Sequence, residues 1–129
     1  DLVKDAQILE KAYDDSKGIT KNFNLNLLSR INSELGGNFN LDTFAHRAFF
    51  NAKESRIEMH LESRVQQRVY LENVNLDIKF EKGETICTEY SHKYTLRQIK
   101  QIANKSGFKI NKIWQDKQKY FALILFSTV

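Results

Sequence analysis

Residues 56–63, which read RIEMHLES, decide the fold class of this chain because apolar and polar side chains alternate along them. Side chains two residues apart lie on the same face of an extended strand. Ile57, Met59 and Leu61 therefore share one face, and the polar residues between them share the other. This pattern predicts a half-buried β-strand with a polar outer face.

The alternation continues beyond this stretch. Val65, Val69 and Leu71 keep the same parity as the apolar residues before them. The sequence therefore predicts one long strand, bent near Ser63 or near residues 66–67.

Two further strands follow. Leu76, Ile78 and Phe80 alternate with charged residues, residues 81–84 form a turn, and residues 83–94 (GETICTEYSHKY) continue as an extended segment. Three or four strands in an antiparallel β-meander are therefore predicted.

Helical periodicity precedes the strands. Residues 8–13 place apolar side chains on one helix face, and apolar residues recur every four positions from Ile19 to Leu35. The pair Gly36-Gly37 then favours a helix cap over a phosphate-binding loop, because no Gly-x-Gly-x-x-Gly pattern follows.

Two more helix starts can be identified. Asn40 or Asp42 is expected to cap a short helix over residues 44–48, which carries Phe44, Ala45 and Ala48. Thr95 and Gln98 form a capping box, and the helix that they open is expected to end at Gly107.

The chain closes with two predicted strands, residues 108–114 and 120–126, joined by a polar turn. The length of the apolar run 121–126 fits a buried strand. The fold class is therefore α+β: N-terminal helices, an antiparallel meander, a capped helix and two closing strands. A chain of 129 residues suits a single domain, residues 1–129.

Composition excludes several classes of protein. The net charge of +4 is mild and the basic residues are scattered, which argues against nucleic-acid binding. No apolar run approaches about 18 residues, so no membrane span is expected. The single cysteine rules out an internal disulfide and favours the reducing cytoplasm. The three histidines have no metal-ligand spacing, so no metal site is expected.

The candidate site lies on the segment 83–94. Glu89 and Ser91 share one strand face, with Cys87 before them and Lys93 after them. A carboxylate acceptor beside a hydroxyl can hold a small heteroaromatic ring by its N–H edges. The alternative, that this face is a solvated polar surface, stays open on spacing alone.

Several blocks of the sequence together resemble one family. They are residues 1–5 (DLVKD), 12–15 (AYDD), 23–28 (FNLNLL), 54–61 (ESRIEMHL) and 83–94. These blocks are similar to the histidine-specific SAM-dependent methyltransferases of ergothioneine biosynthesis, in the right order and spacing. The similarity covers only the C-terminal part of such an enzyme, and the closing strands look like the end of a class I methyltransferase sheet.

The resemblance assigns roles to four residues. It implies that Tyr13 helps to hold the substrate carboxylate, that Met59 lines the histidine pocket, and that Glu89 and Ser91 hold the imidazole ring. Taken without the resemblance, Met59 is a core residue that fills an irregular gap, and Tyr13 is an amphipathic residue on a helix face. No catalytic residue is assigned within the chain.

The resemblance also implies what lies outside the chain. The S-adenosyl-L-methionine pocket would precede Asp1, so the chain is expected to be a substrate-recognition part, inactive and without cofactor by itself. Its expected partners are histidine, the N-terminal SAM-binding half and further copies of itself. Alternatives are a relative that methylates another amino acid or small amine, and a non-catalytic binding domain.

Overall fold

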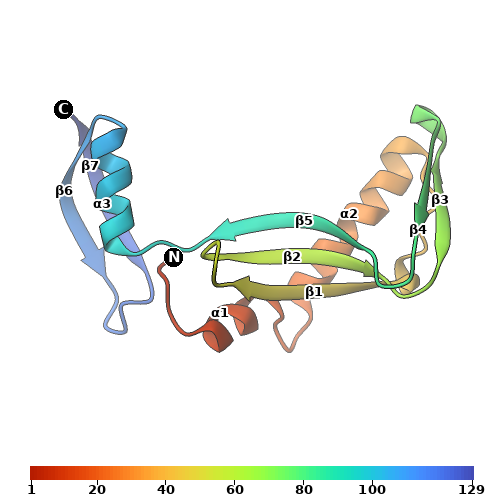
Figure 1. The fold of residues 1–129 in the computed structure, drawn as a ribbon, viewed down its shortest axis with the longest axis horizontal. Helices are drawn as coiled ribbons and strands as arrows, with labels where there is room; N and C mark the ends of the chain where they lie inside the picture. Colours follow the sequence, from red (N-terminus) through yellow and green to blue (C-terminus); the bar gives the residue numbers. More distant parts are fainter.

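The computed structural model describes residues 1–129 and has three parts in a row (Figure 1). A three-stranded sheet lies in the middle, a β-hairpin stands at one end, and a helix with two strands stands at the other. The helices are α1 (Ala6–Tyr13), α2 (Ile19–Leu35) and α3 (Leu96–Lys105). The strands are β1 (Phe44–Asn51), β2 (Arg56–Ser63), β3 (Gln67–Leu71), β4 (Leu76–Phe80), β5 (Thr85–His92), β6 (Phe108–Gln115) and β7 (Ala122–Thr128). The predicted α+β class is confirmed.

The central sheet has the order β1-β2-β5, and both pairs are antiparallel. Its middle strand is the one predicted from alternation, and Ile57, Met59 and Leu61 are all buried. Leu9 of α1 packs against Ile57 and Met59, while Leu28 of α2 belongs to the same core as Leu61. The two N-terminal helices therefore cover one face of the sheet.

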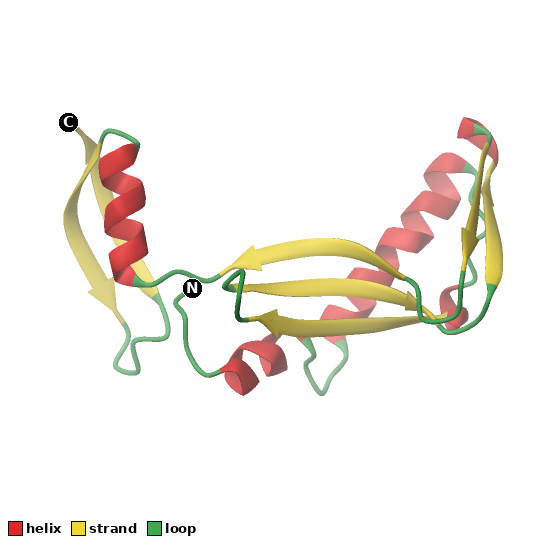
Figure 2. Ribbon diagram, in the orientation of Figure 1, coloured by secondary structure: helices red, strands yellow, loops and turns green.

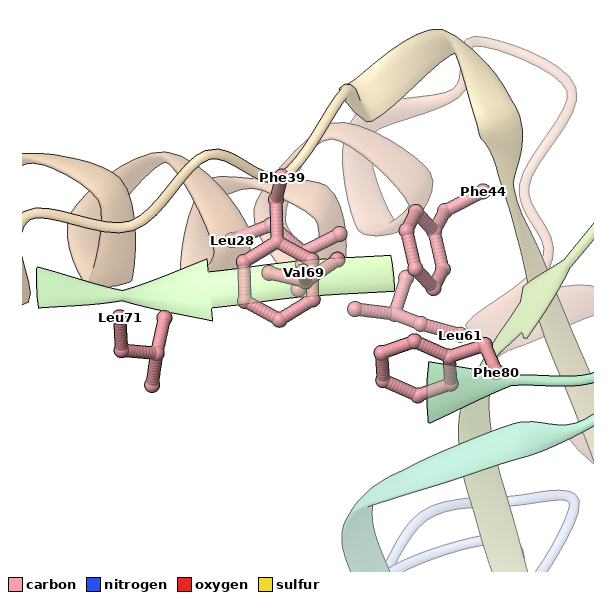
Figure 3. Packing of buried hydrophobic residues seen from close by; sticks show 7 residues of the cluster. All are labelled: Leu28, Phe39, Phe44, Leu61, Val69, Leu71 and Phe80. Atoms are coloured by element: carbon pink, nitrogen blue, oxygen red, sulfur yellow. The ribbon is translucent and has the colours of Figure 1, made fainter. Parts of the chain in front are cut away.

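The largest core lies where α2, the β3–β4 hairpin and the central sheet meet (Figure 3). Phe44 contacts Phe39 and Phe80 edge-to-face, with ring centroids 5.6 and 5.5 Å apart. Leu61 and Val69 fill the space around these rings. This aromatic packing fixes the hairpin against the rest of the chain.

Residues 44–48 form a strand, so the predicted short helix is wrong. Asn40 does act as a cap, but of the single 3-10 turn Leu41–Thr43. The following residues pair one by one with β2, from Phe44 opposite Ser63 to Asn51 opposite Arg56. Pairing along the whole length of β2 outweighs the weak helical spacing of the three apolar residues.

The long strand expected from residue 56 to residue 71 is broken at residues 64–66. The Ser63 hydroxyl donates to the carbonyl of Val65, and the Gln67 side chain donates to the Ser63 hydroxyl. The chain thereby leaves the central sheet and forms the separate β3–β4 hairpin. Because this hairpin is inserted between β2 and β5, the strand order differs from that of a simple meander.

The other two predicted caps are confirmed. Gly36 ends α2 at φ 62°, a left-handed conformation that glycine adopts without a steric penalty. At α3, the Thr95 hydroxyl accepts from the Gln98 backbone N–H, and the Gln98 side chain accepts from the Thr95 N–H. None of the three helices is long and apolar enough to cross a membrane.

The C-terminal unit, made of α3, β6 and β7, stands apart from the central sheet (Figure 2). Within the chain its two strands pair only with each other, so they do not join the central strands. All but the first residue of the apolar run 121–126 lies on β7, as expected, but Phe121, Leu123 and Leu125 are each more than half exposed. One backbone hydrogen bond, from Leu2 to Tyr120, ties the N-terminus to this unit, and another, from Val3 to Tyr94, ties it to the segment that leads into α3.

Candidate functional site

Three of the four predicted site residues lie on the helix-covered face of the central sheet. Met59 on β2 is directly opposite Glu89 on β5, and Ile57 is opposite Ser91. Residues directly opposite each other in an antiparallel pair point to the same side. Met59, Glu89 and Ser91 are therefore neighbours on the face against which α1 and α2 pack.

The fourth predicted residue, Tyr13, reaches this face from the end of α1. Its hydroxyl lies 2.7 Å from the hydroxyl of Ser91. The structure thus joins Tyr13 and Ser91, which are 78 residues apart in the sequence, in a single hydroxyl pair.

A lysine completes this group. Lys93 Nζ donates to Tyr13 Oη at 2.7 Å and to Ser91 Oγ at 2.9 Å, and it lies 3.4 Å from Asp1 Oδ2. The Lys93 side chain is almost fully buried, with 1% of its surface exposed. Buried ammonium groups require such partners, because desolvation of an unpaired charge is costly. Sequence analysis placed Lys93 on this face but gave it no role.

His46 holds the Tyr13 backbone in place, and Asn24 in turn holds His46. His46 Nε2 lies 2.8 Å from the Tyr13 carbonyl and therefore donates to it. His46 Nδ1 is then the acceptor for the Asn24 amide at 3.0 Å. The Asn24 amide also donates to the His60 carbonyl, so this buried residue connects α2, β1 and β2. No spacing in the sequence points to these supporting residues.

Glu89 opens into a cavity of about 230 Å³ between the sheet and α2. Met59 and Thr88 form the sheet side of this cavity, and the α2 side is lined by Phe23, Asn24, Asn26, Leu27 and Arg30. The Glu89 carboxylate is half-buried and makes no hydrogen bond or ion pair with the rest of the chain. An acceptor that borders a cavity of mixed polar and apolar lining is thus free to bind a donor from outside.

The site therefore consists of two adjacent groups. One is Met59 and Glu89 at the cavity, and the other is the cluster of Tyr13, Ser91 and Lys93, which we call the hydroxyl–lysine cluster. Glu89 and Ser91 are two residues apart on β5, which separates their backbone positions by about 7 Å. A small molecule can span this distance. It would meet the Glu89 carboxylate, an acceptor, at one end and the polar hydrogens of the hydroxyl–lysine cluster at the other.

Cys87 does not belong to this site, contrary to the parity argument. Thr88 is an extra residue in β5, since the register passes from Met59–Glu89 to His60–Cys87. This β-bulge turns Cys87 to the opposite face, where its side chain is exposed. The Thr88 hydroxyl donates to the Met59 carbonyl at 3.0 Å, which satisfies an acceptor at the bulge.

The opposite face of the sheet is polar, and its side chains form hydrogen bonds and ion pairs with one another. Glu58 accepts from Arg56 and from Asn51, each at 2.9 Å, and its second oxygen is 3.3 Å from His60. Hydrogen bonds from Arg56 and then from Asn51 lower the pKa of the Glu58 carboxyl below its usual value. The Arg56 guanidinium also stacks 3.6 Å over the ring of Tyr90.

The remaining features of the chain do not form a second site of this kind. No group of His, Cys, Asp or Glu side chains is placed to hold a metal ion. Two larger hollows lie on the C-terminal unit, and neither is lined by a carboxylate side chain.

Comparison with known proteins gives a consistent result. The family model for the histidine-specific, SAM-dependent methyltransferases matches residues 1–128. The chain is 39% identical over 125 residues to a histidine N-alpha-methyltransferase of Mycolicibacterium smegmatis, and 40% identical over 125 residues to that of Mycobacterium tuberculosis. Each match covers 97% of this chain but only 39% of the relative. The chain belongs to the family of histidine-specific, SAM-dependent methyltransferases.

Proposed function

We propose that this chain is the substrate-recognition part of an enzyme that methylates the α-amine of histidine. The observation that carries the proposal is that Glu89, an acceptor without a partner in the chain, lies two residues before Ser91 of the hydroxyl–lysine cluster, which has an O–H left to donate. Histidine offers a matching set of groups: a ring N–H, an unprotonated ring nitrogen and a carboxylate.

In this proposal the chain binds and orients the substrate. Glu89 accepts the ring N–H in a charge-assisted hydrogen bond, and Met59 sets the width of the pocket. Tyr13 and Ser91 contact the acceptor groups of histidine. Holding the ring and the carboxylate leaves the α-amine free, and positioning of this kind is a large part of catalysis of bimolecular reactions.

Specificity for histidine follows from the buried polar groups. A ligand without a ring N–H leaves the Glu89 carboxylate desolvated without a partner, which costs about 1–3 kcal/mol or more for a charged group. A related enzyme acting on another amino acid or small amine is the alternative. The presence of Met59, Glu89 and Ser91 together supports histidine.

The cofactor is proposed to bind outside this chain. The consecutive glycines Gly36-Gly37 do not form a nucleotide cradle, because a Cβ at Gly37 would lie 2.8 Å from Asn32 Oδ1 and 2.9 Å from Leu71 Cδ2. The residues around Gly36 and Gly37 therefore do not fit S-adenosyl-L-methionine. Titration calorimetry of the isolated chain with SAM should give no binding, and micromolar binding would contradict this assignment.

The exposed apolar residues support a partner for the C-terminal unit. Leu123 and Leu125 of β7, Phe121 just before it, and Ile19 and Phe23 of α2 are too exposed for a core and are proposed to pack against the SAM-binding half. The isolated chain is then expected to self-associate through the same faces. A monomer in sedimentation at high concentration would contradict this proposal.

The single cysteine supports a cytoplasmic location.

The proposal is tested by offering the full-length protein SAM and an equimolar mixture of the twenty amino acids. Mass spectrometry should find methyl groups on histidine alone, at the α-nitrogen. Methylation of another amino acid would favour the related-enzyme alternative. No transfer, combined with tight binding of histidine, would favour a non-catalytic binding domain.

A further inference from the structure

The hydroxyl–lysine cluster has a definite hydrogen-bond direction. The Lys93 ammonium has three N–H donors and no acceptor. Two of these donors are used by Tyr13 Oη and Ser91 Oγ, and the third faces the Asp1 carboxylate. Both hydroxyl oxygens must therefore act as acceptors toward Lys93.

The two hydroxyl protons then have fixed roles. Tyr13 Oη and Ser91 Oγ are 2.7 Å apart, so one of their two protons lies between them. The other proton has no acceptor within the chain, whichever hydroxyl carries it. The pair therefore presents one O–H donor to a bound molecule.

Burial makes this arrangement rigid. Only 1% of the Lys93 side chain is exposed, and Nζ also lies 4.7 Å from the centre of the Tyr13 ring. A buried ammonium cannot exchange these partners for water. His46 holds the Tyr13 backbone from the other side, so the Tyr13 hydroxyl stays beside Lys93, whose positive charge disfavours a second donor at this end of the site.

We propose that Lys93 is a positioning residue that fixes the Tyr13–Ser91 pair as a hydrogen-bond donor, so that this end of the site selects a substrate group with a lone pair or negative charge. This inference rests on the proposed function, in which histidine is the ligand. Two groups of histidine have the required chemistry, the carboxylate and the unprotonated ring nitrogen. One end of the site, at Glu89, then accepts a hydrogen bond from the substrate. The other end, at the Tyr13–Ser91 pair held by Lys93, donates one.

The test measures binding of three ligands to the full-length protein by calorimetry, in wild type and Lys93→Met. The ligands are histidine, histamine, which lacks the carboxylate, and the pyrrole analogue of histidine, in which a C–H replaces the unprotonated ring nitrogen. Lys93→Met should weaken histidine binding at least tenfold. It should weaken binding of one analogue much less, and that analogue identifies the acceptor that the cluster holds.

Two further variants separate this role from a structural one. Lys93→Gln keeps an N–H donor without the charge and should recover part of the lost affinity, and it also serves if Lys93→Met does not fold. Lys79→Met removes an exposed lysine, paired with Glu81 on the surface, and should leave all three affinities unchanged. An equal loss for all three ligands, with no recovery in Lys93→Gln, would overturn the inference. A wild-type protein that does not bind histidine would instead contradict the proposed function.

Discussion

Glu58 and Glu89 lie on neighbouring strands of one sheet, but the two faces use their carboxylates in opposite ways. Glu58, on the open face, is bonded to Arg56, Asn51 and His60. Glu89, on the helix-covered face, has no partner in the chain and borders a cavity. A carboxylate that the chain itself satisfies stabilises the fold, whereas one left without a partner at a cavity is available for a ligand.

The difference extends to the residues around each carboxylate. The covered face combines a buried apolar stripe with the hydroxyl–lysine cluster. Its polar groups are therefore few, and each has a defined role as hydrogen-bond donor or acceptor. The open face is a continuous set of ion pairs and stacked rings, including Phe49 on His60. Four expected outcomes sharpen this comparison.

The largest expected effect is on the apolar part of the covered face. Leu61 is completely buried between α2 and the sheet, so Leu61→Ala should lower the free energy of unfolding by about 2–5 kcal/mol. Glu62→Ala, the next residue and on the open face, should change it by about 1 kcal/mol or less. Chemical denaturation of the isolated chain measures both, and equal effects would remove the distinction between the faces.

Glu58→Ala should lower the melting temperature, because it leaves Arg56 and Asn51 without their shared acceptor. In the full-length enzyme it should leave the KM for histidine unchanged. Thermal melts and steady-state kinetics test the two parts. A raised KM with an unchanged melting temperature would place Glu58, and not Glu89, in the binding site.

Acid should weaken the open face first. The pKa of Glu58 is lowered in the folded chain by its hydrogen bonds, so the stability that it contributes is complete above the pKa of an unfolded glutamate, about 4.3, and is lost as the pH falls through the folded value. Thermal melts of wild type and Glu58→Gln should therefore differ at pH 6 and converge toward pH 3. A difference that stays constant over this range would contradict the linkage.

The smallest effect is expected at the bulge that separates the two faces. Thr88→Val keeps the shape of the side chain but removes the hydrogen bond to the Met59 carbonyl, at a cost of about 0.5–1.5 kcal/mol. Thr88→Ser keeps the hydroxyl and should cost less. Urea denaturation compares the two, and equal losses would show that the hydroxyl does not stabilise the bulge.

Sequence periodicity predicted the covered face well, because burial of Ile57, Met59 and Leu61 depends on parity alone. It missed β1, where the inward-facing His46 interrupts the apolar alternation of Phe44 and Ala48 and leaves a spacing that also fits a helix. It predicted a bend near Ser63 but not that the strand ends there, because Val65 keeps the apolar parity although the chain has already left the sheet.

The sequence predicted that Glu89 and Ser91 share a face, but it did not predict the contacts of the candidate residues. Glu89 and Ser91 share a strand face by spacing, whereas the contact of Ser91 with Tyr13 depends on how α1 packs on the sheet. The bulge at Thr88 is a change of one residue and leaves no periodic signal, so Cys87 was assigned to the wrong face. Parity placed Lys93 on this face, but lysine is rarely buried, so nothing in the sequence predicted that its side chain would be buried there.

The central claim is that Glu89 binds the substrate while Glu58 supports the fold, and steady-state kinetics of the full-length enzyme with histidine tests it most directly. Glu89→Ala removes a charge-assisted hydrogen bond worth about 1.5–3 kcal/mol, so kcat/KM should fall at least tenfold while the melting temperature stays near the wild-type value. Glu72→Ala, which removes an exposed glutamate far from the cavity, is the matched control and should change neither quantity. An unchanged kcat/KM in Glu89→Ala would contradict the assignment of this site.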